Sequence, residues 1–105
     1  MPIKNIGAFT IEVDDEGFMT DHTKWNRDIA AAIAAEEGIA QLTDRHMAVI
    51  DFMRKEFIEK GTGPSIRRLT KESGVETKEL YALFPGGPAK QSAKIAGIKK
   101  PAGCI

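Results

Sequence analysis

The chain contains a single cysteine and two histidines among its 105 residues. One thiol cannot form an internal disulfide, and zinc ribbons, iron–sulfur centres and c-type haem sites each need several cysteines or a Cys-His run. Gly86-Gly87 is followed by proline, without the Gly-Lys-Ser/Thr ending of a phosphate loop. We therefore expect no disulfide, no metal site and no resident cofactor.

A long apolar run is also missing. The longest, Ile29 to Ala35, is far shorter than the roughly 18 to 20 residues that span a bilayer. The first residues lack the basic segment, apolar segment and cleavage site of a secretory signal. With 42% hydrophobic and 29% charged residues, the composition is that of one small globular domain. We expect a cytoplasmic protein without a membrane partner.

Acidic residues are absent from the last quarter of the chain. No Asp or Glu follows Glu79, and residues 61–105 hold 8 Lys and Arg against 3 acids, whereas residues 1–60 hold 7 against 12. The lysines of the last quarter are Lys90, Lys94, Lys99 and Lys100. They predict an anionic or acidic partner for this segment, with the alternative that they only keep it soluble.

The first twenty residues predict a β-hairpin. Phe9, Ile11 and Val13 alternate with polar residues, residues 14–17 read Asp-Asp-Glu-Gly, and Phe18 resumes an apolar strand. A two-stranded hairpin is marginal by itself, so we expect it to pack on helices.

Five helices are expected after the hairpin, because apolar residues recur at helical spacing between capping residues and glycine or proline stops. Their approximate ranges are 25–37, 44–60, 65–73, 77–83 and 88–96. The second has the clearest pattern, with Thr43 as N-cap and an apolar stripe from His46 to Phe57. The sequence thus predicts a mainly α (α+β) fold, an N-terminal hairpin on a bundle of about five helices.

Periodicity stops at Gly97. We therefore expect a body over residues 1–96 and a mobile C-terminal arm over residues 97–105, with Cys104 as its penultimate residue. Fully stretched, the arm reaches about 30 Å, against a radius of gyration of about 13 Å for a compact body of this length. The thiol can then enter a cleft of another protein.

Cys104 is the strongest candidate for chemistry. A residue so near the end of a Gly- and Pro-containing segment is a poor core member, and an exposed thiol can serve as nucleophile, sulfur acceptor or site of a mixed disulfide. An incidental tail cysteine is the alternative. Because the terminal carboxylate disfavours the thiolate and the nearest lysines are four and five residues away, a partner has to activate it. We expect a carrier rather than a self-sufficient enzyme.

Residues 66–84 are spaced like a helix-turn-helix, with Thr70, Gly74 and Leu80 at the inner positions. A recognition helix offers Arg, Asn, Gln or Lys to base edges, whereas residues 78–83 offer one lysine, one glutamate and mostly apolar side chains. Two packed helices are the simpler interpretation, and direct nucleic-acid binding is the less favoured one. The solvated face would consist of Arg67, Arg68 and Lys71.

The two histidines do not form a ligand pair. His22 and His46 have Asn26 and Ile50 at i+4, neither of which completes a metal motif. Because His46 begins the apolar stripe, we expect it to be a hydrogen-bonded structural residue.

Several motifs together resemble a known family. The C-terminal ones are Leu83-Phe84-Pro85-Gly86-Gly87-Pro88-Ala89-Lys90-Gln91, Lys94-Ile95-Ala96-Gly97, Lys100-Pro101 and Cys104-Ile105. Upstream are Asp15-Glu16-Gly17-Phe18, Trp25, Glu37-Gly38-Ile39, His46, Phe52 and Pro64-Ser65-Ile66-Arg67. This set resembles the DsrC/TusE family of small sulfur carriers, whose members are often called the gamma subunit of dissimilatory sulfite reductase.

The resemblance implies a helical body with an N-terminal hairpin and a mobile arm whose penultimate cysteine, here Cys104, carries sulfur as a transient persulfide. It implies a sulfur donor of DsrEFH/TusBCD type, and a tRNA-thiolating enzyme or a sulfite reductase as acceptor. It also implies that Arg67 contacts the docked arm.

One position departs from part of the family. Members linked to sulfite reductase carry a second arm cysteine where this chain has Ala93, so an internal disulfide or trisulfide is excluded. The single thiol and the context of Gln91 resemble the TusE branch, although the insertion common in the tRNA-relay protein is absent at residues 74–77. We expect a TusE-like sulfur relay. The alternatives are a partner or structural subunit of sulfite reductase and a helix-turn-helix regulator.

Overall fold

The computed structural model describes residues 3–99. Its strands are β1 (Ile3–Ile6) and β2 (Phe9–Glu12), and a 3-10 turn η1 (His22–Lys24) follows. Its helices are α1 (Arg27–Glu36), α2 (Asp44–Lys60), α3 (Ile66–Ser73), α4 (Thr77–Leu83) and α5 (Pro88–Ile95). The predicted hairpin and helical bundle are confirmed. Within the described part of the chain, no helix is long and apolar enough to cross a bilayer.

The strands of the hairpin differ from the predicted ones. β2 pairs antiparallel with β1, with Ile6 opposite Phe9 around a turn that contains Gly7 at φ +57°. The predicted pairing across residues 14–17 survives as a single bridge between Val13 and Met19. Strand β1 was not predicted, because four residues with a polar centre carry too little alternation to indicate a strand.

Local capping chemistry sets the ends of α2. The Thr43 hydroxyl accepts from the backbone N–H of His46, and the His46 ring accepts in return from the N–H of Thr43, which forms a capping box. Gly61 ends the helix in the left-handed conformation. Helix α4 covers the predicted residues 77–83, and Glu76 occupies its N-cap position without a side-chain hydrogen bond.

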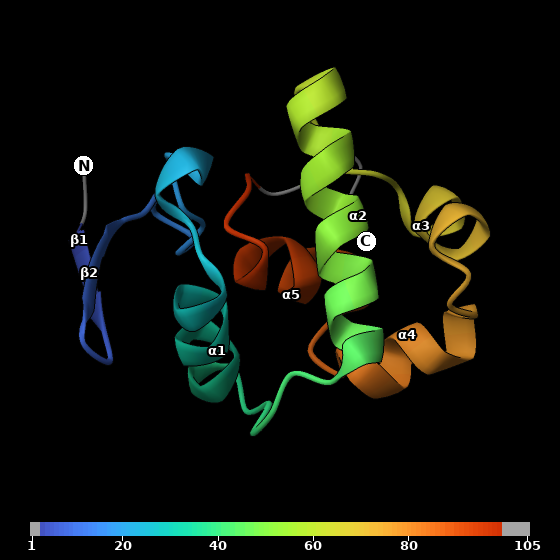
Figure 1. The fold of residues 1–105 in the computed structure, drawn as a ribbon, viewed down its shortest axis with the longest axis horizontal. Helices are drawn as coiled ribbons and strands as arrows, with labels where there is room; N and C mark the ends of the chain where they lie inside the picture. The colour runs from blue at the N-terminus through green and yellow to red at the C-terminus, as the bar shows by residue number, and fades with distance from the viewer. Residues whose placement is uncertain (1–2, 100–105) are drawn as a thin grey trace.

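Helix α5 lies at the centre of the molecule. Figure 1 shows it between α1 and α2, with the hairpin beyond α1 and the α3–α4 pair on the far side of α2. It packs against α1, α2 and α4. Six of its eight residues are buried, namely Pro88, Ala89, Gln91, Ser92, Ala93 and Ile95. The C-terminal segment therefore starts from the best-packed element of the fold.

Two residues assigned to the mobile arm belong to the body instead. Gly97 is buried, and the side chain of Ile98 is 1% exposed within the hydrophobic core. The reason is apolar burial combined with a hydrogen bond from the Ile98 N–H to the carbonyl of Ala93, which keeps the chain on the helix end. Lys99 is exposed, and the rest of the predicted arm lies outside the described residues.

Candidate functional site

The predicted site residues fall into separate places. Cys104 and Lys100 lie outside the described residues. Lys99, the last described residue, and Lys90 on α5 are both exposed. The side chains of these two lysines are therefore open to solvent.

Lys94 has a different environment from the one expected. Its Nζ lies 3.5 Å from Oε2 of Glu37 and 5.8 Å from the ring centroid of Phe18, and its side chain is 20% exposed. The fold thus places an acid beside a lysine that has none near it in the sequence. Lys94 ties α5 to the end of α1 and is not a free steering charge.

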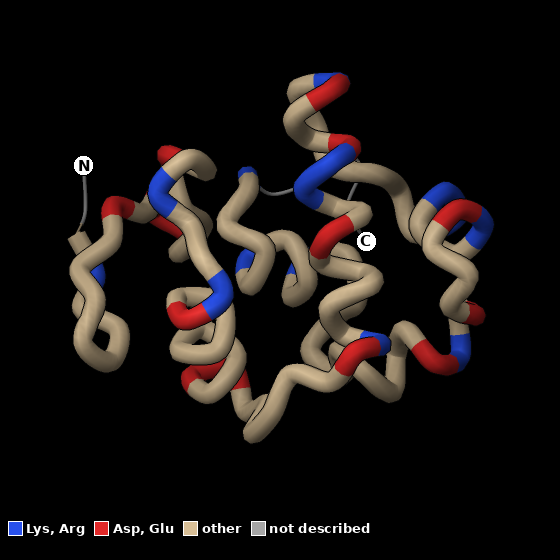
Figure 2. The backbone as a smooth tube through the Cα atoms, viewed as in Figure 1, with Lys and Arg blue, Asp and Glu red and all other residues tan. Residues whose placement is uncertain are grey.

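Arg67 lies on a basic hollow at the start of α3. The hollow has a volume of about 290 Å³ and is lined by Ser65, Arg67, Arg68 and Lys71. In Figure 2 the blue positions of α3 lie on the side of the molecule away from the hairpin. Among the described residues, neither Arg67 nor Lys71 has an ion pair, so two like charges one helical turn apart face solvent. An anionic group would relieve their repulsion.

Arg68 is not available to an anionic group, because a buried acid binds its guanidinium. Glu56 of α2 is 3% exposed and accepts from the Arg68 guanidinium, while Nζ of Lys60 lies 3.5 Å away. The hydrogen bond from Arg68 holds the pKa of Glu56 below its ordinary value, although burial opposes the shift. Because Arg68 points back to α2, the outward charge of the hollow comes from its neighbours.

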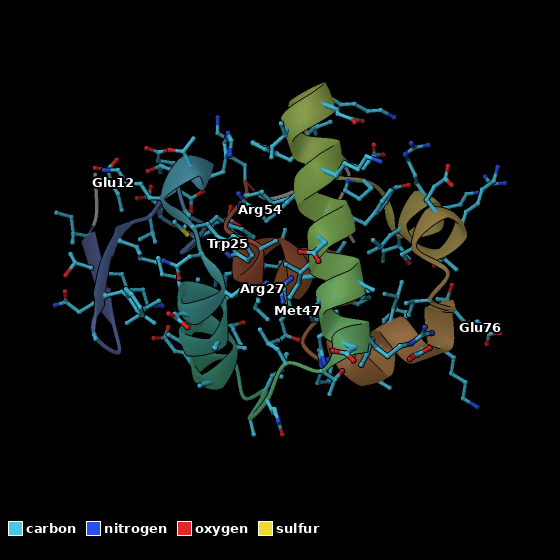
Figure 3. All side chains as sticks on the ribbon, viewed as in Figure 1. Glu12, Trp25, Arg27, Met47, Arg54 and Glu76 are labelled. Atoms are coloured by element: carbon cyan, nitrogen blue, oxygen red, sulfur yellow. The ribbon has the colours of Figure 1, made fainter. Side chains whose placement is uncertain are left out.

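Trp25 and Arg54 meet at the C-terminal end of α5. The Trp25 Nε1–H donates to the carbonyl of Ile95 at 2.8 Å. The Arg54 guanidinium donates to the carbonyls of Ala96 at 2.9 Å and His22 at 3.1 Å. Its Cζ lies 4.1 Å from the Trp25 ring centroid, and Figure 3 shows the two side chains side by side between α1 and α2. We call this pair the clamp.

The clamp supplies what a helix end lacks. The last carbonyls of an α-helix have no partner within the helix and carry partial negative charge, so they favour a cation and hydrogen-bond donors. Burial lowers the pKa of Arg54, and the charge of Asp51 opposes this shift. An arginine remains charged under such shifts, so the carbonyl dipoles stabilise a fixed positive charge at this point.

Gly97 completes the root of the C-terminal segment. It adopts φ +70°, and a Cβ at this position would lie 2.4 Å from Cδ1 of Trp25. Together with the Ile98-to-Ala93 hydrogen bond of 3.2 Å, this is the Schellman geometry. Only glycine meets both the conformation and the space.

The sequence pattern alone did not indicate this clamp. The first helix was expected over residues 25–37, but α1 begins at Arg27, with Asn26 as N-cap, and Trp25 lies before it. Arg54 received no assignment. The available signal was that Arg54 is four residues after Ile50 and thus borders the apolar stripe of α2, where a cation needs a buried polar partner.

The histidine prediction is confirmed for His46. Its Nδ1 lies 2.8 Å from Oγ1 of Thr43, its Nε2 lies 3.0 Å from the carbonyl of Leu83, and its ring meets Phe84 edge-on. These contacts join α2 to α4 and leave neither nitrogen for catalysis. Across residues 3–99, no group of three or more His, Cys, Asp or Glu side chains is arranged to hold a metal ion.

The α3–α4 pair gains no recognition residue from the structure. The helices pack on each other across the turn at Gly74, as the spacing predicts. The carboxylate of Glu79, however, accepts two hydrogen bonds from Arg45, at 2.6 and 2.8 Å. Lys78 is then the one exposed cation that α4 offers. The DNA-reading interpretation is not supported.

Comparison with known proteins identifies the family. A family model described as "DsrC like protein" matches residues 5–105 of the chain. The chain belongs to the DsrC-like family. The resemblance inferred from the motifs is thereby confirmed, and the match extends over the segment that carries the cysteine.

Two kinds of curated relative are similar to this DsrC-like chain. "Sulfurtransferase TusE" of Salmonella typhimurium is 44% identical over 102 residues, covering 90% of this chain and 93% of the relative. The gamma subunit of dissimilatory-type sulfite reductase of Nitratidesulfovibrio vulgaris is 36% identical over 96 residues, covering 91% of each.

Solved structures of the family share the fold. The crystal structure titled dissimilatory sulfite reductase I (DsrI) has a TM-score of 0.87 at 34% identity, covering 99% of this chain and all of the other. The oxidized gamma subunit (DsrC) from Archaeoglobus fulgidus has a TM-score of 0.82 at 32% identity, with the same coverage. The body described here is therefore a DsrC-like body.

Proposed function

We propose that this protein is a sulfur relay that accepts and passes on a persulfide sulfur at Cys104. The observation that carries the proposal is that the family match runs through residue 105 and that Cys104 is the one thiol of the chain. The names of the relatives, sulfurtransferase and sulfite reductase gamma subunit, both concern sulfur chemistry. A carrier with a single thiol has only this residue with which to hold the sulfur.

The transfer needs no oxidant or cofactor. The Cys104 thiolate attacks the outer sulfur of a donor persulfide, the S–S bond of the donor breaks, and the donor cysteine leaves as a thiolate. A new S–S bond now holds that sulfur on Cys104. An acceptor that reacts with the same outer sulfur regenerates the Cys104 thiolate, so electrons and atoms balance in both steps.

The cations of the C-terminal segment and of α3 suggest how a partner is recognised. Lys90, Lys99 and Lys100 accompany the segment that carries Cys104, while Arg67 lies on the basic hollow of α3. An acidic surface on a donor of DsrEFH/TusBCD type, or on an acceptor, would complement these charges. We assign Arg67 to partner contact on this ground.

Two acceptors remain in the proposal. In favour of a thiolating enzyme, Ala93 is buried in α5 and the chain has no second thiol with which to form an internal disulfide. In favour of a sulfite reductase, the gamma-subunit alignment of 96 residues covers 91% of this chain, which is the same number of residues. That alignment is therefore almost free of gaps. The TusE alignment spans 102 positions for 90% of this chain, so some TusE positions have no counterpart here.

Intact mass spectrometry tests the proposal. The protein is incubated with a persulfidated sulfurtransferase, and wild type is expected to gain one sulfur, about 32 Da, that a thiol reductant removes. Cys104→Ser, with an unchanged circular dichroism spectrum, should gain nothing. A wild type without the adduct, or an adduct that persists in Cys104→Ser, contradicts it. Duplex DNA binding that survives Cys104→Ser and weakens in Arg67→Ala or Lys78→Ala would favour the regulator instead.

A further inference from the structure

We propose that Trp25 and Arg54 are positioning residues for sulfur transfer, because their clamp sets the pivot of the Cys104 segment at Lys99. The inference rests on the proposed relay function. It assigns to the body a task besides supporting the cysteine, namely to fix the residue at which the chain leaves the fold and the direction in which it leaves.

Hydrogen-bond donors from two separate elements converge on the C-terminal end of α5. Trp25 comes from the loop before α1 and Arg54 from the middle of α2, yet both donate to consecutive carbonyls, those of Ile95 and Ala96. Arg54 also donates to the carbonyl of His22, so one guanidinium joins η1 to the end of α5. A helix end that frays would break the contacts to Ile95 and Ala96 together.

The side chains of Trp25 and Arg54 also restrict each other. The guanidinium lies 4.1 Å from the indole centroid, close enough for cation–π stacking. Both groups have few alternative rotamers once they are stacked and hydrogen-bonded, so the entropic cost of holding the carbonyls is already met in the fold. The clamp is preorganised.

The backbone that follows α5 stays enclosed for two residues before it reaches the surface. Gly97 passes so close beneath Trp25 that no side chain fits there, and Ile98 is 1% exposed. Lys99 is the first residue after this pair with an exposed side chain. The change from buried to exposed therefore occurs between residues 98 and 99, and the pivot lies there.

The position of the pivot determines how many residues separate it from Cys104. From Lys99 to Cys104 the chain spans five residues, which reach about 17 Å when stretched. If the clamp opens and the chain is freed from Ile95 onward, nine residues separate the anchor from Cys104. Once the body is docked on a partner, the effective concentration of the thiol at the partner's cleft falls roughly as the −3/2 power of this length. The rate of sulfur uptake should therefore drop about two- to threefold.

The test compares Arg54→Gln and Trp25→Phe with wild type. Phe at position 25 retains a ring for stacking but loses the donor to Ile95, so it keeps the test valid if Arg54→Gln folds poorly. Arg45→Gln is the matched control, since it removes an arginine of the same helix whose partner is the Glu79 carboxylate of α4 and not a carbonyl at the end of α5. Arg54→Lys, which retains the charge but cannot span two carbonyls, should show an intermediate effect.

Two readouts separate positioning from general stability. Amide hydrogen exchange should accelerate at Ile98, whose N–H bonds the Ala93 carbonyl, and stay unchanged at Ile50 in the core of α2. The rate of sulfur uptake from a persulfidated protein donor, measured as kcat/KM, should fall about two- to threefold, while alkylation of Cys104 by iodoacetamide stays unchanged.

The outcomes are distinguishable. Unchanged exchange at Ile98 in both variants, or an unchanged ratio of sulfur uptake to alkylation, overturns the positioning role. An equal loss in Arg45→Gln overturns it as well, because the effect would then be one of general stability. A wild type that takes up no sulfur refutes the relay function itself, whatever the exchange data show about the clamp.

Discussion

Glu56 of α2 and Arg68 of α3 form an ion pair in which the acid is almost completely buried. The side chain of Glu56 is 4% exposed, whereas that of Arg68 is 42% exposed. The pair joins α3 to α2 and neutralises Arg68, although this residue also lines the hollow. As a result, the outward charge of α3 belongs to Arg67 and Lys71.

This pair predicts a pH dependence. Because the folded pKa of Glu56 is lowered from 4.5, its contribution to stability is present above that pH and is lost as pH falls through the lowered value. Glu56→Gln should lower the free energy of unfolding by about 1 to 2 kcal/mol at pH 7, and its stability should fall less than that of wild type below pH 4.5.

Urea unfolding at pH 7, 4 and 3 measures both effects. Glu72→Gln is the control, since Glu72 is 44% exposed and its carboxylate lies 3.8 Å from Arg68. It should change stability by less than about 0.5 kcal/mol. A Glu56→Gln variant that retains the wild-type acid dependence would show that this pair does not control it.

Truncation of His46 should lower the free energy of unfolding. His46→Ala leaves the Leu83 carbonyl and the Thr43 N–H without their partners and removes a ring packed on Phe84, so we expect a loss of about 2 to 4 kcal/mol. Thr43→Ala, which removes the N-cap hydroxyl alone, should cost about 1 kcal/mol. Equal losses in the two variants, measured by urea unfolding, would contradict the additional bonds assigned to the ring.

The lack of space beneath Trp25 predicts that any side chain at position 97 strongly lowers the free energy of unfolding. Gly97→Ala forces a residue with a Cβ into φ +70° and places that Cβ 2.4 Å from the indole. Strain and overpacking together should cost about 2 to 4 kcal/mol. Gly38→Ala is the matched control, since Gly38 has φ +89° with nothing within 4 Å, and should cost about 1 kcal/mol. If both variants unfold at the same urea concentration, the contact with Trp25 has no energetic weight.

Charge reversal tests the basic hollow. Arg67→Glu combined with Lys71→Glu should reduce sulfur uptake from a protein donor about tenfold at low ionic strength and less at high salt, because the surface is exposed to screening. Iodoacetamide should still alkylate Cys104 at the wild-type rate. Lys78→Glu, an exposed reversal on α4, is the control. Equal uptake by wild type and the double variant at both salt concentrations would remove the hollow from partner recognition.

Much of the fold could be predicted because its signals are local. Thr43 caps α2, Gly61 and Gly74 end α2 and α3, and Pro88 opens α5, each through interactions within a few residues. The hairpin was predicted only in part, because the pairing of β1 with β2 depends on a weakly patterned strand. The motifs around Cys104 identified the family, and position 104 is stated by the sequence itself.

The sequence by itself determined the helices, the single thiol and the family, because capping, glycine conformation and motif order act at short range. The tertiary structure decided the rest. It paired Lys94 with Glu37, set Trp25 and Arg54 on the end of α5 and enclosed Ile98 in the core. These contacts join residues more than forty positions apart, or bury a residue that its neighbours leave unmarked, and only the packing of separate elements decides which of them form.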